Sequence, residues 1–346
     1  MGKWYNDRPN IKLVIIWGIQ LTSVCRTAVF YGDALARYGF ENPHPWHSDR
    51  IFAFWSKFQN ENLDKSSQIV IKDPVSADEE SILTFHERDY VDLVKKSSKI
   101  GSGFLDMGDT PAFQGIFEAS SFVVGTTLEC LNLLMKKPHE VQHVFNPIGG
   151  LHHARRDSAA GFCVFNDIGV AILIARKRYG LKRIAYIDID AHHGDGIYYE
   201  FENDPLLFMA DIHEDGRFLY PGTGSELETG IGEAEGTKLN IPLAPNSLDK
   251  DFIIAFNKIE NFINNVAKPE LIILQCGADS LNGDPLTHLK YTPYAHRYAT
   301  DIIHRLAHKH CMGRLIALGG GGYNRANIAS AWTEVVKSLL AEPQHG

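Results

Sequence analysis

The sequence predicts an α/β fold with three layers, in which a central, mostly parallel sheet lies between helices. The first observation is that the apolar run 183–187 is short and β-branched, as in a strand buried on both faces. The second is that similar runs at 141–146, 269–276 and 314–318 alternate with helical patterns. The third is that each run ends in glycines, histidines or carboxylates, and open parallel sheets bind ligands at that end.

Length and composition favour one large domain over residues 31–346, preceded by a leader or an added strand over residues 1–30. No repeat, linker or block of like charge divides the chain, and an apolar share of 44% suffices for a sizeable core. The apolar stretch 13–21 is too short to cross a membrane. The sequence behind it is a poor signal-peptide cleavage site, so secretion is the minority interpretation.

The distribution of charges and cysteines limits the expected binding partners and the expected cellular compartment. The net charge is −8 and the basic residues are scattered, which disfavours direct nucleic-acid binding. Five widely spaced cysteines without a C-x-x-C pair indicate reduced thiols, not a disulfide framework. We therefore expect a cytoplasmic protein that interacts neither with nucleic acid nor with a membrane.

The helices and the remaining strand follow in order along the chain. Two prolines predict a shaped loop at 42–50, and a helix begins at residue 48 or 49. Its expected apolar side consists of Ile51, Phe52, Phe54, Trp55 and Phe58. Further helices are expected within 79–94 and at 119–134, 167–179, 249–266 and 292–310, with a strand at 206–210. In the last helix we expect solvated or helix-terminal histidines, namely His296, His304, His308 and His310.

The residues after the run 183–187 suggest a metal site. Side chains alternate along a strand, so Asp188 and Asp190 point to the same side, with His192 beyond them. Burying clustered carboxylates is costly unless a cation or hydrogen bonds compensate, although an N-capping loop with incidental histidines is the alternative. Asp279 follows another predicted strand. Asp190, His192 and Asp279 thus form a three-ligand set with open positions, which suits catalytic zinc and also Fe(II), Mn(II) or Co(II).

Two further groups stand at predicted strand ends. His152 and His153 follow a Gly-Gly turn, and adjacent side chains on an extended chain need separate partners. Four glycines at 319–322 allow a close backbone approach and place the hydroxyl of Tyr323. A divalent ion that activates water, a histidine that accepts and returns a proton, and a tyrosine that donates to an oxyanion suit an amide hydrolase.

Several separated motifs resemble, in the same order, those of the histone deacetylase family, which includes acetoin-utilisation proteins and acetylpolyamine amidohydrolases. They lie at 147–166, 186–196, 220–224, 276–285 and 318–332, with His44-Pro45 and Asp109 in addition. The resemblance covers roughly residues 31–340 and is that of a bacterial-type single-domain member. It implies the arginase/deacetylase fold and a deacetylase catalytic domain over residues 31–346.

The resemblance implies a role for each catalytic residue. Asp190, His192 and Asp279 match the zinc ligands, with Fe²⁺ as the alternative metal. His152 and His153 match the tandem pair, which Asp188 and Asp195 respectively orient, and His153 is the expected general base and acid. Tyr323 matches the residue that polarises the scissile carbonyl.

The resemblance also implies substrate and cation sites. Asp109 is the expected rim carboxylate, and Gly161, Phe162 and Tyr220 the walls of a narrow acyl-lysine tunnel. Leu286, at a gate position, and Gly321 complete the expected substrate site. Asp188 and Asp211 are expected to hold a structural K⁺.

The implied function is removal of acetyl or other acyl groups from lysine side chains by a zinc-dependent amidohydrolase. The alternative is deacetylation of acetylpolyamines or other small acylamides. The glutamates at 226, 228, 233 and 235 would favour such a cationic substrate. Leu286 disfavours it, because some polyamine-selective relatives carry Glu at this position. A non-catalytic acyl-lysine binder would be expected to lack Tyr323 or a metal ligand. A binuclear manganese ureohydrolase would need carboxylates where Gly194 and Leu281 stand.

Overall fold

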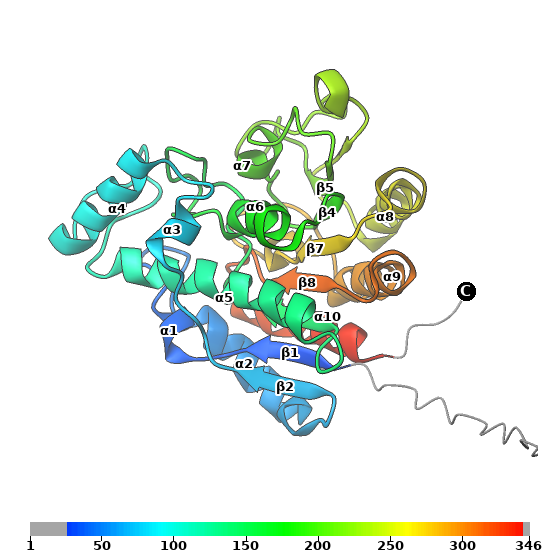
Figure 1. The fold of residues 1–346 in the computed structure, drawn as a ribbon, viewed down its shortest axis with the longest axis horizontal. Helices are drawn as coiled ribbons and strands as arrows, with labels where there is room; N and C mark the ends of the chain where they lie inside the picture. The colour runs from blue at the N-terminus through cyan, green and yellow to red at the C-terminus, as the bar shows by residue number, and fades with distance from the viewer. Residues whose placement is uncertain (1–25, 342–346) are drawn as a thin grey trace, which may run out of the picture.

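The computed structural model describes residues 26–341, and these form one sheet of eight strands between two layers of helices (Figure 1). Every strand pair is parallel, and the order is β2-β1-β3-β8-β7-β4-β5-β6. The strands are β1 Thr27–Phe30, β2 Ile69–Lys72, β3 His143–Asn146, β4 Ile184–Asp188, β5 Leu207–Glu214, β6 Lys238–Leu243, β7 Leu271–Gln275 and β8 Leu315–Leu318. The predicted three-layer α/β fold is confirmed.

The helices cover both faces of the sheet. They are α1 Asp33–Ala36, α2 Arg50–Asn60, α3 Glu79–Ile82, α4 Arg88–Ile100, α5 Ile116–Lys136, α6 Asp167–Tyr179, α7 Asp195–Tyr198, α8 Asp249–Phe262, α9 Pro293–Cys311 and α10 Arg325–Leu340. One hydrophobic core lies between the sheet and α4, α5 and α6, and a second lies between the sheet and α2, α8, α9 and α10 (Figure 1).

Successive side chains of each central strand point to opposite faces of the sheet, so each strand contributes apolar side chains to both cores. On β4, Tyr186 belongs to the core beneath α5 and α6, whereas its neighbour Ile187 belongs to the core beneath α8 and α9. On β3, Val144 and Phe145 divide in the same way. Both faces of these strands are therefore buried, which is why their sequences are continuous apolar runs without polar alternation.

The structure differs from the sequence-based expectations at the margins of the sheet. The two edge strands, β2 and β6, were not predicted. The apolar run of β2 has only three residues, 69–71, and β6 is interrupted by Lys238, Asn240 and Pro242. The apolar stretch 13–21 lies outside the described residues, whereas β1 lies within the range 1–30. Among the described residues, no helix is long and apolar enough to span a membrane.

Three side chains also differ from expectation. Phe52, expected on the apolar side of α2, is 40% exposed, because the buried stripe passes through Ile51, Phe54 and Phe58. His296 and His304, expected in solvent or at a helix end, are 1% and 2% exposed within α9. The burial of α9 against the sheet and α10 is a tertiary effect that its mixed sequence does not reveal.

The close contact between α5 and the segment before α3 gives a test of the packing. A Cβ added at Gly125 would lie 2.2 Å from the backbone N of Ala77 and 2.3 Å from the carbonyl O of Val75. Helix propensity alone predicts that Gly125→Ala stabilises α5 by about 1 kcal/mol. We expect the opposite, a loss of about 1–3 kcal/mol in the free energy of unfolding, because backbone atoms must move. Denaturant unfolding measures the sign, and a more stable variant would contradict the contact.

Candidate active site

Four adjacent strands deliver the candidate site residues to one edge of the sheet. In the order β3-β8-β7-β4, these strands are followed by the His152-His153 pair, Tyr323, Asp279 and Asp190 respectively. The chain places β7 and β8 between β3 and β4, so residues far apart in sequence become neighbours. Their location at the carboxyl ends of the strands is the usual ligand position of an open parallel sheet.

Asp190, His192 and Asp279 converge as a candidate metal centre. Nδ1 of His192 lies 3.0 Å from Oδ1 of Asp190 and 3.1 Å from Oδ2 of Asp279. One ligand atom from each of the three residues lies within 4.8 Å of the other two, and all three side chains are buried. Burial and the nearby Asp190 charge raise the pKa of Asp279 to about 7. A donor set of two carboxylates and one imidazole therefore fits a divalent cation in charge as well as in ligand type.

Neighbouring polar groups orient these carboxylates. Oδ2 of Asp190 accepts hydrogen bonds from Nε2 of Gln275 at 2.8 Å and from the backbone N–H of Gly321 at 2.9 Å. Oδ1 of Asp279 accepts from the backbone N–H of Ala191 at 2.9 Å. The sequence interpretation missed Gln275, since a polar residue that ends an apolar strand carries no local sign of its partner. Gly321, expected at the substrate, is placed here as a support of Asp190.

The tandem histidines have separate carboxylate partners. Nδ1 of His152 lies 2.8 Å from Oδ2 of Asp188, and Nδ1 of His153 lies 2.7 Å from Oδ1 of Asp195. Burial acts to lower the pKa of His152, but the charges of Asp188 and Asp190 outweigh it and raise that pKa to about 9. Burial, together with His152, lowers the pKa of His153 to about 4. His153 is consequently the neutral member of the pair, as a general base must be.

A cavity of about 230 Å³ opens onto this group. Its lining consists of Asp109, His153, Gly161, Phe162, His192, Leu219, Tyr220, Leu286 and Tyr323. All of the expected tunnel, rim and gate residues except Gly321 are therefore brought together, and Leu219 is an addition. Gly161 has φ +51°, and a Cβ there would lie 2.5 Å from Cδ2 of His153, so the wall fits closely against the imidazole.

The rim of the cavity is shaped by a residue that the sequence interpretation missed. Oδ1 of Asp106 accepts hydrogen bonds from the backbone N–H groups of Gly108, Asp109 and Thr110 at 2.8–2.9 Å. The hydroxyl of Thr110 in turn accepts from the backbone N–H of Phe162 at 3.1 Å. This Asp turn therefore ties the rim carboxylate of Asp109 to the cavity wall.

Tyr323 is placed by the glycine turn before it and by a buried arginine. The guanidinium of Arg50 donates to the carbonyl oxygens of Gly320 and Gly322 at 2.5 and 2.9 Å, and it stacks 3.8 Å from the ring centroid of Trp46. Burial lowers the pKa of Arg50 to about 10, so it stays charged at neutral pH. Burial also raises the pKa of Tyr323, with the active-site carboxylates adding to the shift, so its hydroxyl keeps its proton and remains a donor.

Asp188 and Asp211 lie opposite each other on the paired strands β4 and β5. Oδ2 of Asp211 accepts from the backbone N–H of Gly194 at 2.9 Å, and its Oδ1 lies 2.7 Å from Nδ1 of His213. Burial raises the pKa of Asp188, His152 opposes this shift, and the Asp211 charge adds to it. The two carboxylates therefore face each other across paired strands, and each has a histidine ring beside it.

The comparison with protein families identifies the chain. The profile of the histone deacetylase domain matches residues 44–339. The chain belongs to the histone deacetylase family. It is 37% identical over 319 residues to the acetoin utilization protein AcuC of Bacillus subtilis (strain 168), covering 90% of this chain and 81% of the relative. It is 33% identical over 319 residues to histone deacetylase B of Dictyostelium discoideum, covering 90% and 73%.

A solved structure agrees with this placement. The histone deacetylase-family chain superimposes on the crystal structure of the HDA15 HD domain with a TM-score of 0.83 and 28% sequence identity, over 92% of this chain and 88% of that one. Family membership establishes a hydrolase with deacetylase function.

Arg50 offers a test of how the glycine turn supports Tyr323. Arg50→Met leaves two buried carbonyls without their donor, so we expect a loss of about 1–3 kcal/mol in the free energy of unfolding. We also expect a fall in kcat larger than the change in KM, because the turn places the tyrosine. Denaturant unfolding and deacetylase kinetics measure the two effects.

The control for this prediction is Arg88→Met, which removes an exposed ion pair with Glu79 and should leave the free energy of unfolding nearly unchanged. In a Tyr323→Phe background, the effect of Arg50→Met on kcat should largely disappear, since both changes act through the same hydroxyl. Additive effects of the two substitutions would contradict the proposed link.

Proposed function

We propose that this member of the family is a zinc-dependent deacylase that removes acetyl or other acyl groups from lysine side chains. The observation that carries the proposal is that His153, Tyr323 and His192 line one cavity, and that His192 belongs to the Asp190-His192-Asp279 group. A Zn²⁺ ion held by this group would supply Lewis-acid activation of water and of the amide carbonyl. Fe²⁺ suits the same donors and is the alternative.

In this proposal each protein group has a separate task. His153, neutral and held through Nδ1 by Asp195, accepts a proton from the attacking water at Nε2 and returns it to the leaving amine. Tyr323 keeps its proton and donates a hydrogen bond to the oxygen that becomes negative. His152, paired with Asp188, places a second imidazole beside the first, with the two ring centroids 4.1 Å apart.

A structural K⁺ between Asp188 and Asp211 is part of the proposal. It would offset the charge of two carboxylates that face each other across β4 and β5. Because Asp188 also contacts His152, a cation at this position would change the electrostatic environment of His152 and so its pKa.

Acyl-lysine is the proposed substrate class because apolar side chains make up most of the cavity lining. Phe162 and Tyr220 line it, and the apolar Leu286 stands at its mouth, 38% exposed. None of the glutamates at 226, 228, 233 and 235 belongs to the described lining, and Glu228 instead accepts hydrogen bonds from Tyr199 and Ser225. A polycationic amine would therefore meet little negative charge inside the cavity, apart from Asp109 at the rim.

The catalytic roles can be separated from metal binding. We expect Tyr323→Phe and His153→Ala each to lower kcat by about 10²–10⁴-fold while the metal content stays at the wild-type level. His192→Ala should instead lose the active-site metal. Kinetics with an acetyl-lysine peptide and elemental analysis of the same samples measure both effects. Loss of the active-site metal in Tyr323→Phe or His153→Ala would show that ligands and catalysts have been misassigned.

The proposed substrate class can be tested by comparing kcat/KM for different acylated substrates. We expect kcat/KM to be higher for an acetyl-lysine peptide than for N-acetylputrescine, because the described cavity walls are apolar and the peptide backbone can reach the rim carboxylate of Asp109. A longer-acyl lysine peptide tested alongside them reports the acyl-chain preference. A preference for N-acetylputrescine would reject the acyl-lysine proposal and favour the small-amide alternative.

A further inference from the structure

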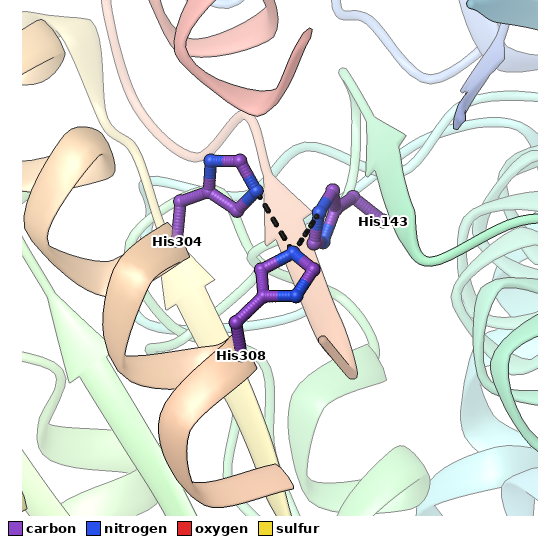
Figure 2. A group of neighbouring side chains, drawn as sticks. All are labelled: His143, His304 and His308. Carbon is purple, nitrogen blue, oxygen red and sulfur yellow. Dashed lines mark hydrogen bonds between the residues drawn. The ribbon is translucent and has the colours of Figure 1, made fainter. Parts of the chain in front are cut away.

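A second group of histidines lies at the other end of β3 from the catalytic pair. His143 is the first residue of β3, whereas His304 and His308 lie one turn apart on α9. Figure 2 shows the three rings turned toward one another. Nε2 of His308 lies 3.2 Å from Nε2 of His143 and 3.1 Å from Nε2 of His304. The arrangement therefore joins a central strand to a helix through three imidazole nitrogens.

Hydrogen bonding alone does not account for this arrangement. An imidazole nitrogen carries either one proton or one lone pair, directed along a single line in the ring plane. Nε2 of His308 faces two other nitrogens, so at most one of these two contacts can be a well-directed hydrogen bond. The other contact is then either a poorly directed hydrogen bond or a nitrogen pair with no proton between them.

The spacing instead matches a metal ligand set. Ligand nitrogens at 2.0–2.1 Å from a tetrahedral Zn²⁺ lie about 3.3–3.4 Å from one another. The two measured separations are close to this value, and all three ligand atoms lie within 4.8 Å of one another. We propose that His143, His304 and His308 bind a divalent transition-metal ion, Zn²⁺ in the first place, at the amino-terminal edge of the sheet.

The protonation of the rings suits this role. Burial, with the neighbouring imidazoles, lowers the pKa of His143, and burial lowers the pKa of His304 to about 4, so both rings are neutral at pH 7. A backbone hydrogen bond with Ser338 opposes the shift of His304, as a carbonyl acceptor would, and Gly313 acts in the same sense on His143. Metal-binding histidines commonly use one ring nitrogen for a carbonyl and direct the other at the metal.

Two of the three rings are buried, which suits a structural site, and the third is partly exposed, which gives an ion a route of entry. His143 and His304 are 0% and 2% exposed, whereas His308 is partly exposed. An ion held here would cross-link β3 to α9, two elements that are distant in sequence. Three neutral imidazoles leave the double charge of the ion uncompensated, so the partly exposed side is where a water or an anion would complete the coordination.

Metal counting on the full chain tests the proposal independently of catalysis. After expression with Zn²⁺ and gel filtration, we expect two metal equivalents per chain in the wild type, one for each donor group. His308→Gln and His192→Ala should each retain one. His310→Gln is the matched control, because His310 lies on the same helix but contacts Asn264, and it should retain both.

Co²⁺ loading keeps the test decisive if His308→Gln fails to fold. In the His192→Ala chain we expect visible d–d absorption and a rise in Tm on adding Co²⁺, both from the histidine site. A folded His192→Ala chain that binds no Zn²⁺ and shows no Co²⁺ bands would overturn the proposal. A wild type with one equivalent that His192→Ala loses would also overturn it, while leaving the proposed active-site metal intact.

Discussion

Burial of negative charge at the carboxyl ends of adjacent strands is the constraint on which the active site depends. Asp188, Asp190 and Asp279 are each at most 1% exposed. A carboxylate loses several kcal/mol when it leaves water without compensation. Backbone N–H groups, imidazoles and Gln275 offset part of this cost, yet the pKa of Asp279 is still raised to about 7. A divalent cation is the compensation that suits the remaining charge, which joins the stability of this region to its chemistry.

The same constraint explains the glycine-rich loops. The N–H of Gly321 donates to Asp190 and that of Gly194 donates to Asp211, and each bond requires the backbone to approach a carboxylate closely. A Cβ at Gly321 would lie 2.3 Å from Oδ2 of Asp279. These glycines are thus required for the solvation of buried anions, not for flexibility. Because Tyr323 follows the turn that contains Gly321, the same turn positions the proposed oxyanion donor and supports Asp190, a proposed metal ligand.

The sequence predicted the elements and residues that carry a local signal. The end of β4 was predictable because an apolar run changes abruptly to carboxylates and histidines, and α6 was predicted with the bounds that the structure gives it. The edge strands β2 and β6 were missed because the apolar run of β2 is only three residues long and polar residues interrupt that of β6. Arg50 and Gln275 were missed for another reason: their partners are backbone carbonyls and a carboxylate that reach them only in the folded chain. Likewise, a histidine on a mixed helix does not reveal whether strand β3 will cover it.

The two candidate metal sites lie at opposite ends of the sheet and differ in charge, and this difference separates their proposed roles. At the carboxyl end of the sheet, the two carboxylates and one neutral imidazole of the Asp190-His192-Asp279 group would balance the charge of a divalent ion completely, so an uncharged amide could approach without displacing an anion. At its amino end, three neutral imidazoles supply no negative charge, and the proposed ion keeps its full charge beside a partly exposed ring. Such an ion holds α9 against the sheet through its ligands, whereas the cavity and the His153-Asp195 pair lie at the opposite end. The sheet would therefore carry the proposed structural cation at one end and the proposed catalytic cation at the other.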